Sequence, residues 1–315
     1  MLAYSLAFTY GIIECSGRDA SDFLQRMTTN DLAALGLGEA AGSALVTEKG
    51  RMVDFLTIAR LGDTHWRLVT SPANEAAVYQ WLRKYVIMED VQLALLTNTF
   101  ATVELWSDQN ESPTSIQHIL APIMDGRDAV RYERIPKRLE NGFNLSLLLL
   151  RTQDVEQTVQ QLSALGAIPL STEQRECIRI RSGIGQFPNE FNEQYTPLDA
   201  GLADSVRLGK GCFIGQEVLE RLVVQNKVRW KLWSVECDAA AAKELQNVPS
   251  IITTASGQAV GQITSLAPPC DYLGSSTEQS WIGLAYLSRE VSHDTAIGTS
   301  SGMPLYLRHV VTIVS

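Results

Sequence analysis

The sequence lacks the residue patterns that mark several common classes of protein. Its five cysteines are odd in number and include no CxxC pair, which argues against a disulfide framework or a zinc ribbon and predicts a reducing compartment. Its four histidines show no metal-ligand spacing, so no metal site is expected. No GxxxxGKS/T phosphate loop is present either. The composition therefore gives no sign of a metalloprotein or a nucleotide-binding P-loop protein.

Long apolar runs and an excess of basic residues are also missing. The apolar N-terminus, MLAYSLAFTYGIIEC, is far too short for a membrane span and has no basic leader, so it is expected to form one first strand of a cytoplasmic protein. The net charge of −9 argues against a general nucleic-acid binder. Residues 205–231 nevertheless carry +4 while the remainder carries −13. This local field suits a small, multiply charged anion, and a solvated basic helix face is the alternative.

What the sequence does contain is a glycine-rich stretch around one cysteine, GKGCFIGQEVLER at residues 209–221. Three glycines within seven positions predict a tight turn with free backbone amides. The apolar spacing from Gln216 to Leu222 predicts a helix, so Cys212 would precede a helix N-terminus beside Lys210. Both features favour a thiolate or an anionic ligand. From this stretch alone, a small buried structural cysteine is the more common outcome.

The segment Lys210–Glu217, KGCFIGQE, resembles the signature of the YgfZ family, which are folate-binding relatives of the glycine-cleavage T-protein, an aminomethyltransferase. FPNEFNEQYTPLDAGL at residues 187–202 and FLQRMTTNDLAALGLGEAAGSALVTEKGRMVDFL at residues 23–56 are similar to that superfamily as well. The resemblance implies an α+β fold in which two ferredoxin-like α/β lobes form a folate-binding channel, followed by a small C-terminal β-barrel. The domains expected are residues 1–227 for the bilobed region and residues 228–315 for the barrel.

The resemblance also implies site residues. Cys212 would be the reactive or cluster-contacting thiol, with Lys210 as its electrostatic support. Asp54 is the nearest counterpart of a T-protein aspartate that serves the reaction and that the YgfZ branch commonly lacks; an ordinary edge-strand carboxylate is the alternative. Arg181 stands where the T-protein has a pterin-holding glutamate and cannot accept a hydrogen bond, so pterin recognition there is lost or reversed. The other expected cofactor-binding residues are Arg229, Arg221, Glu190, Gly211, Gln216 and Glu217. For Glu190, a polar surface loop is an equally good interpretation.

Local patterns support two lobes and a barrel. Residues 17–27 have the apolar period of a helix, and two strand-helix-strand units at residues 66–96 and 143–170 predict comparable lobes. The polar segment 107–115 is expected to carry the chain between them. Ser171 and Gln174 form a capping-box pair that predicts a helix over 171–182. From Val228, short β-rich runs separated by Pro, Gly and Ser predict a barrel or sandwich.

Three functions are compatible with these observations. The first, which we adopt, is a folate-binding accessory protein in the assembly or repair of iron-sulfur enzymes, with effects on tRNA modification. Its cofactor would be tetrahydrofolate or another reduced folate, and its partners iron-sulfur client or assembly proteins; whether it catalyses a reaction is left open. The second is a tetrahydrofolate-dependent aminomethyltransferase, which Arg181 contradicts. The third is a non-enzymatic module that binds tRNA or protein, against which the acidic balance counts.

Overall fold

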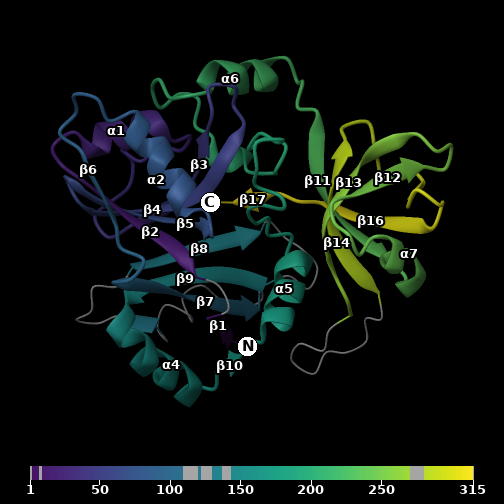
Figure 1. Cartoon of the computed structure of the whole chain (residues 1–315), viewed down its shortest axis with the longest axis horizontal. Helices are drawn as coiled ribbons and strands as arrows, with labels where there is room; N and C mark the ends of the chain where they lie inside the picture. The colour runs from purple at the N-terminus through teal and green to yellow at the C-terminus, as the bar shows by residue number, and fades with distance from the viewer. Residues whose placement is uncertain are drawn as a thin grey trace.

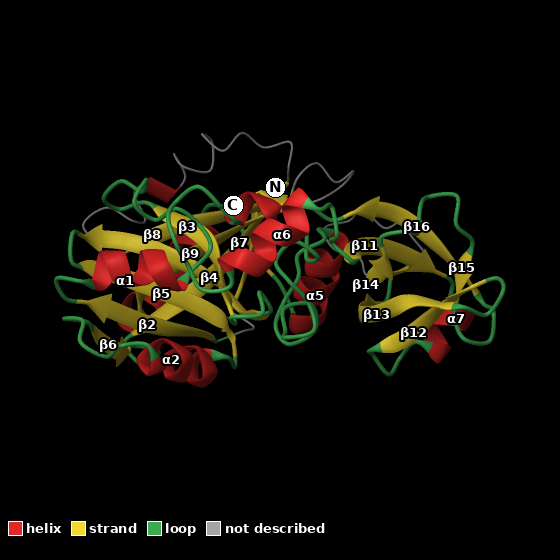
Figure 2. Ribbon diagram, turned by 90° about the horizontal axis from the view of Figure 1, so that it is seen from above, coloured by secondary structure: helices red, strands yellow, loops and turns green. Residues whose placement is uncertain are grey.

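Two α/β lobes lie together at one end of the molecule and a closed β-barrel lies at the other (Figures 1 and 2). This computed structural model describes residues 2–6, 9–108, 120–121, 130–136, 143–269 and 280–314. The predicted fold class, two α/β lobes followed by a small C-terminal barrel, is confirmed.

The first lobe is an antiparallel sheet with strand order β3-β4-β5-β2-β6. Its elements are β2 (Tyr10–Ser16), α1 (Ala20–Met27), β3 (Ala40–Val46), β4 (Met52–Gly62), β5 (His65–Pro72), α2 (Glu75–Lys84) and β6 (Gln92–Leu95). Helix α1 buries the side chains at the predicted helical spacing, from Ala20 to Met27. They share one apolar cluster with Val78 and Leu82 of α2, so both helices cover the same face of the sheet.

The second lobe is a mixed sheet with strand order β10-β1-β7-β9-β8-β17. Its elements are β1 (Leu2–Ser5), β7 (Phe100–Asp108), β8 (Val130–Pro136), β9 (Phe143–Arg151), α4 (Val155–Ala164), β10 (Ile168–Pro169) and β17 (Ile313–Val314), with a 3-10 turn η1 (Thr152–Asp154) before α4. Strand β1 pairs in parallel with β10, and the other neighbours in this sheet are antiparallel. The C-terminal strand β17 therefore returns from the barrel to this lobe.

The chain crosses between the lobes at places that the sequence did not predict. The apolar N-terminus forms two strands, β1 and β2, which belong to different sheets. The second crossing lies at residues 96–99, between β6 and β7. It does not lie at residues 107–115, because Ser107 and Asp108 are still part of β7, and residues 109–115 fall outside the described residues. Strand propensity marks a strand but not the sheet that it joins.

The barrel closes in the strand order β11-β14-β13-β12-β15-β16. Its elements are β11 (Trp230–Cys237), α7 (Ala239–Glu244), β12 (Ser250–Thr254), β13 (Ala259–Ala267), β14 (Trp281–Ser288), β15 (Ile297–Gly298) and β16 (Pro304–Val310). Alternate side chains such as Trp233, Val235 and Cys237 on β11 point into its apolar core, as the two-residue period of a strand requires.

Helix α5 (Thr172–Arg181) lies between the lobes and the barrel (Figures 1 and 2). The predicted capping box is present: the Ser171 hydroxyl accepts a hydrogen bond from the Gln174 amide at 3.2 Å, and the Gln174 side chain accepts one from the Ser171 amide at 3.0 Å. Two buried arginines of this helix form ion pairs with residues outside it. Arg175 Nη2 lies 2.6 Å from Glu104 Oε1 on β7, and Arg179 Nη1 lies 3.1 Å from Glu190 Oε2.

The cysteines do not all remain thiols as expected. Cys177 on α5 is disulfide-bonded, whereas Cys15 and Cys237 are free and buried and Cys212 is free and exposed. Sequence spacing could not predict this bond, because a disulfide depends on which Cα atoms the fold brings within reach.

No helix in the described part of the chain is long and apolar enough to cross a bilayer.

Candidate functional site

The glycine-rich stretch forms an ordered loop that leads into helix α6 (Gln216–Val224). Gly211 has φ +107° and Gly215 has φ +79°, both in the left-handed region that favours glycine. At Gly215 a Cβ atom would lie 2.6 Å from the carbonyl oxygen of Thr47, so the loop passes closely over the turn between β3 and β4. The predicted glycine turn and helix are therefore present.

The loop is held by its own side chains and amides. Phe213 and Leu219 are buried in a core cluster that also contains residues of β3, β4 and the barrel. The amide of Phe213 donates to Gln216 Oε1 at 3.2 Å, and the amide of Ile214 donates to the Arg26 carbonyl at 3.1 Å. These two amides are therefore not free, contrary to the prediction. Gln216, expected at the cofactor, instead ties the loop together, since its Nε2 also donates to the Leu208 carbonyl at 3.3 Å.

Cys212 lies at the exposed part of this loop. Its thiol is free, and Gly211 and Glu217 beside it are exposed as well. The loop is anchored on one side by Phe213, so Cys212 is presented to solvent from a fixed backbone. The structural alternative, a small buried apolar cysteine, does not apply here.

Lys210 is directed toward the end of a helix from the other half of the chain. Its ammonium donates to the carbonyl of Gln25, in the last turn of α1, and lies 5.2 Å from the Phe213 ring centroid. A cation at this end satisfies an unpaired carbonyl and opposes the negative end of the helix dipole. Burial lowers the pKa of Lys210 to about 8, although the charge of Asp31 acts in the opposite direction.

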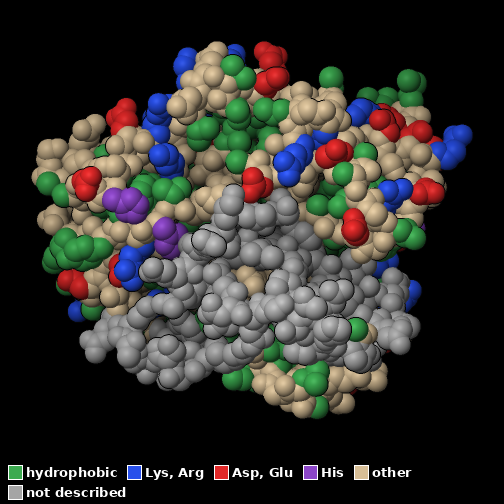
Figure 3. All heavy atoms as spheres, turned by 180° about the vertical axis from the view of Figure 1, so that it is seen from behind, with side chains coloured by type: hydrophobic (Ala, Val, Ile, Leu, Met, Phe, Trp, Pro, Cys, Tyr) green, Lys and Arg blue, Asp and Glu red, His purple; other side chains and the backbone are tan. Residues whose placement is uncertain are grey.

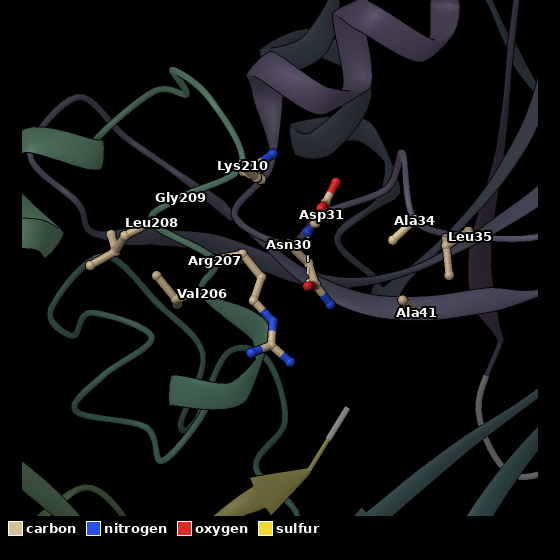
Figure 4. Close-up of a pocket in the computed structure, with 10 residues that line it drawn as sticks. All are labelled: Asn30, Asp31, Ala34, Leu35, Ala41, Val206, Arg207, Leu208, Gly209 and Lys210. Carbon is tan, nitrogen blue, oxygen red and sulfur yellow. Dashed lines mark hydrogen bonds between the residues drawn. The ribbon is translucent and has the colours of Figure 1, made fainter.

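A cavity of about 610 Å³ lies beside Lys210. Its lining comes from the turn after α1, from β3 and from the segment before Lys210: Asn30, Asp31, Ala34, Leu35, Ala41, Val206, Arg207, Leu208, Gly209 and Lys210. In Figure 4 the guanidinium of Arg207 extends alongside Asn30. The two walls are joined by hydrogen bonds, because the Arg207 amide donates to the Thr29 carbonyl at 2.9 Å and the Thr29 hydroxyl donates to the Ser205 carbonyl at 2.7 Å.

Asp31 and Asn30 of this cavity are held in place by hydrogen bonds within the protein. Asp31 Oδ1 accepts hydrogen bonds from Gln25 Nε2 at 2.9 Å and from the Ala33 amide at 3.2 Å. Asn30 Nδ2 donates to the Gly42 carbonyl at 2.8 Å. With cationic, acidic and apolar groups in one lining, the cavity suits a medium-sized ligand with an apolar body, hydrogen-bond donors and negative charge. The sequence analysis covered Arg207 only through the positive charge of residues 205–231, and Asn30 and Asp31 only as part of the similar segment 23–56.

Asp54 and Arg181 lie elsewhere and are engaged in the fold. Asp54 is fully buried on β4, an interior strand of the sheet, so the edge-strand interpretation is wrong. Its carboxylate accepts hydrogen bonds from the amides of Phe55 at 2.8 Å and Ser71 at 2.9 Å. Arg181, at the end of α5, is 7% exposed, and its Nη2 donates to the Ser280 carbonyl at 3.5 Å.

Glu190 is fully buried, so the interpretation as a polar surface loop is wrong for this residue. Its Oε1 accepts hydrogen bonds from the hydroxyls of Thr264 and Ser265 on β13, each at 2.6 Å. Its Oε2 accepts from the Gln186 amide at 3.0 Å and pairs with Arg179. Glu190 therefore joins α5 to the barrel.

Arg221 and Arg229 are exposed and do not line the cavity in the part of the chain that the structure describes. The Arg229 guanidinium lies 4.9 Å from the ring centroid of the adjacent Trp230. On the face shown in Figure 3, Lys and Arg side chains are interspersed with Asp and Glu over the described surface. Among the described residues, no group of three or more His, Cys, Asp or Glu side chains is placed to hold a metal ion.

Residues 7–120 match the family profile of the GCVT N-terminal domain. This part of the chain is a GCVT-family domain. The chain is 25% identical over 291 residues to an Arabidopsis thaliana protein provisionally named a chloroplastic transferase, covering 90% of this chain and 64% of that protein. It is 26% identical over 231 residues to an aminomethyltransferase of Herpetosiphon aurantiacus, and this match covers 68% of this chain and 61% of that protein. The matched region thus spans less than two thirds of either relative.

The GCVT-like fold extends over the whole chain. The crystal structure of the glycine cleavage system aminomethyltransferase T from Bartonella henselae superposes with a TM-score of 0.75 at 17% sequence identity, covering 98% of this chain and 85% of that one. At this level of identity the likeness shows the fold: two GCVT-type lobes and the barrel.

Proposed function

We propose that this chain is a folate-binding accessory protein of the aminomethyltransferase-like superfamily that acts in the assembly or repair of iron-sulfur enzymes, as a member of the YgfZ branch. The observation that carries the proposal is the exposed, free Cys212 on a glycine-held loop, two residues from the cavity-lining Lys210. Burial raises the pKa of the Cys15 thiol to about 12 and that of the Cys237 thiol to about 11, so both stay protonated at neutral pH. Among the free cysteines of the described residues, Cys212 is the one whose thiol is exposed for exchange with a partner.

The cavity fits a reduced folate chemically. A pterin is a flat ring with apolar faces and a donor edge, and its glutamate tail is anionic. Asn30 and Asp31 offer oxygen acceptors, Leu35 and Val206 offer apolar surface, and Arg207 offers a guanidinium for a carboxylate. A bound folate would supply a carrier for a one-carbon unit. The volume of about 610 Å³ lies within the usual range for ligands of this size.

A tetrahydrofolate-dependent aminomethyltransferase is the second candidate, because several similar proteins carry that name. Against it stands Arg181, which has no acceptor for a pterin and whose guanidinium donates to a carbonyl. A tRNA-binding module is a weaker third candidate, because the chain is acidic and, on the face shown in Figure 3, the described basic side chains are interspersed with acidic ones.

Complementation tests the proposal. In cells that lack this protein, the activity of an iron-sulfur enzyme is measured with the wild type, Cys212→Ala and the matched buried variant Cys237→Ala, beside the melting temperature of each purified protein. Cys212→Ala should lose rescue while melting like the wild type, since the side chain is exposed. Cys237→Ala should have a lower melting temperature than the wild type. The fraction of this variant that folds should still restore the activity of the iron-sulfur enzyme. Full rescue by Cys212→Ala would refute the role of the thiol, and a glycine-cleavage assay then tests the aminomethyltransferase alternative.

A further inference from the structure

Three basic residues of the positive segment 205–231 have no place in the cavity. Arg221, Lys227 and Arg229 are exposed at or beyond the C-terminal half of α6, and among the described residues they are not part of the cavity lining. None of the three forms an ion pair within the described part of the chain. Their charge is therefore not neutralised by the protein itself.

The C-terminal end of α6 fixes the backbone that carries these side chains. The Lys227 amide donates to the Leu222 carbonyl at 2.8 Å, and the Asn226 amide donates to the Val223 carbonyl at 3.0 Å. With Asn226 at φ +50°, this is the Schellman pattern of a helix end. The residues that follow α6 therefore start from an ordered turn.

A fourth exposed cation, Arg289, reaches the same turn from the end of β14. Its guanidinium donates to the Asn226 carbonyl, and its amide donates to the Arg229 carbonyl at 2.9 Å. The exposed acidic residues next to these cations in the sequence are Glu220 and Glu290. Four cations and two carboxylates thus gather at one end of α6, in a chain whose net charge is −9.

Exposed apolar side chains lie within this basic cluster. Val223 is 48% exposed and Val224 is 77% exposed, in the last turn of α6. An apolar centre with a charged rim is the arrangement of a protein interface. A nucleic-acid backbone would gain from the cations but has no need of two aliphatic side chains. We call this surface the α6 patch, and it consists of Arg221, Val223, Val224, Lys227, Arg229 and Arg289.

We propose that the α6 patch docks an acidic segment of a partner protein, with apolar side chains of that segment against Val223 and Val224. Charge complementarity selects aspartate and glutamate, because the patch is positive on a molecule that is otherwise acidic. Figure 1 shows α6 at the outer edge of the molecule, where a partner can approach it.

The position of the patch links it to Cys212. This thiol precedes the N-terminus of α6, and a helix of nine residues is about 13 Å long. An interface of standard size, about 800 Å² on each partner, covers both ends of such a helix. The inference rests on the proposed function only in identifying the docked protein as the one that Cys212 meets. Docking itself requires neither the thiol nor folate.

Fluorescence anisotropy with a defined peptide tests the inference. The probe is a fluorescein-labelled peptide with two leucines flanked by glutamates. One control peptide has serine in place of the leucines, and the other has glutamine in place of the glutamates. The wild-type protein should bind the probe at least about tenfold more tightly than either control, and binding should weaken as salt is added. Equal binding of the serine control, or no binding of the probe, would overturn the proposal.

Matched variants locate the binding surface. The double variant Lys227→Glu, Arg229→Glu should bind the probe at least about tenfold more weakly, whereas Lys243→Glu, on the exposed surface of α7, should bind as the wild type does. Val224→Ser should weaken binding about fivefold or more, because it removes apolar surface from the contact. Ile251→Ser, which changes a side chain 59% exposed on the barrel, is its control. Similar losses in the variants and their controls would contradict docking at the α6 patch.

Two further measurements separate this inference from its alternatives. An unmodified tRNA transcript that displaces the probe, and that the Lys227→Glu, Arg229→Glu variant no longer binds, would overturn the proposal in favour of a nucleic-acid surface. Cys212→Ala should bind the probe as the wild type does. Probe binding together with full rescue by Cys212→Ala would refute the proposed function alone. Loss of rescue by Cys212→Ala without probe binding would refute the docking alone.

Discussion

Lys210 ties the glycine-rich loop to the first lobe, because its ammonium donates to the carbonyl of Gln25 in α1. The sequence motif singled out Lys210 and Cys212 as a pair, and the structure places Cys212 in solvent while Lys210 reaches a carbonyl of α1, 185 positions away in the sequence. A motif identifies residues by their neighbours in sequence, and no local pattern could predict a hydrogen bond over that separation. The same limit explains why Arg207, whose amide bonds to Thr29, was not recognised as a cavity residue.

The lowered pKa of Lys210 predicts a specific pH dependence of stability. Between pH about 8 and its ordinary value of 10.5, the unfolded chain holds a proton that the folded chain has released. The cost of burying this amine is therefore fully present below pH 8 and is relieved as the pH rises through that window. Urea unfolding of the wild type and Lys210→Met from pH 7 to pH 10 should show the wild type gaining stability relative to the variant. Parallel curves would contradict the assigned environment.

At the scale of elements, sequence patterns predicted the helices whose formation depends on neighbouring residues in the chain. The apolar period fixed α1, and the pairing of Ser171 with Gln174 fixed the start of α5. These local patterns failed where the position of a strand depends on which other strands it pairs with. The N-terminal apolar run divides between two sheets, and the lobe crossing at residues 96–99 has no strong turn signature. The fold class was predictable because the family resemblance implied it and the order of the expected elements agreed with it.

The two left-handed glycines of the site loop allow a matched comparison. Both Gly211→Ala and Gly215→Ala impose left-handed backbone strain of about 1–3 kcal/mol. An added methyl group meets open space at Gly211 but comes within 2.6 Å of the Thr47 carbonyl at Gly215. Gly215→Ala should therefore lower the free energy of unfolding more than Gly211→Ala in chemical denaturation. An equal loss would show that the loop does not pack on the turn between β3 and β4.

At the scale of the whole molecule, buried ion pairs of α5 join the second lobe to the barrel. Arg175 pairs with Glu104 of the second lobe, and Arg179 pairs with Glu190, whose carboxylate also bonds to the barrel. Glu176, 30% exposed, bridges the two arginines. The sequence had placed Glu190 at the cofactor because it lies in a polar segment, and only the fold reveals how many protein groups surround it.

Glu190→Gln tests this connection. The change leaves the Arg179 charge without its fully buried partner and should lower the free energy of unfolding by about 3–5 kcal/mol. The matched control is Glu48→Gln, since Glu48 has a side chain 62% exposed and lies 3.7 Å from Lys84. That change should cost less than about 1 kcal/mol. Thermal and urea unfolding measure both, and a similar small loss for the two variants would show that Glu190 does not join α5 to the barrel.

Calorimetric titration with a reduced folate tests the central claim most directly. The wild type should bind, and Arg207→Ala should bind roughly 10–100-fold more weakly, because it removes a hydrogen bond to a charged group. Two control variants, Arg229→Ala and Arg83→Ala, should bind as the wild type does, because neither residue lines the cavity. Arg229 is a residue that the sequence analysis expected at the cofactor, and Arg83 is exposed on α2. Failure of the wild type to bind would remove the folate function. Unchanged binding by Arg207→Ala, with loss in Arg229→Ala, would place the ligand outside the cavity beside Lys210.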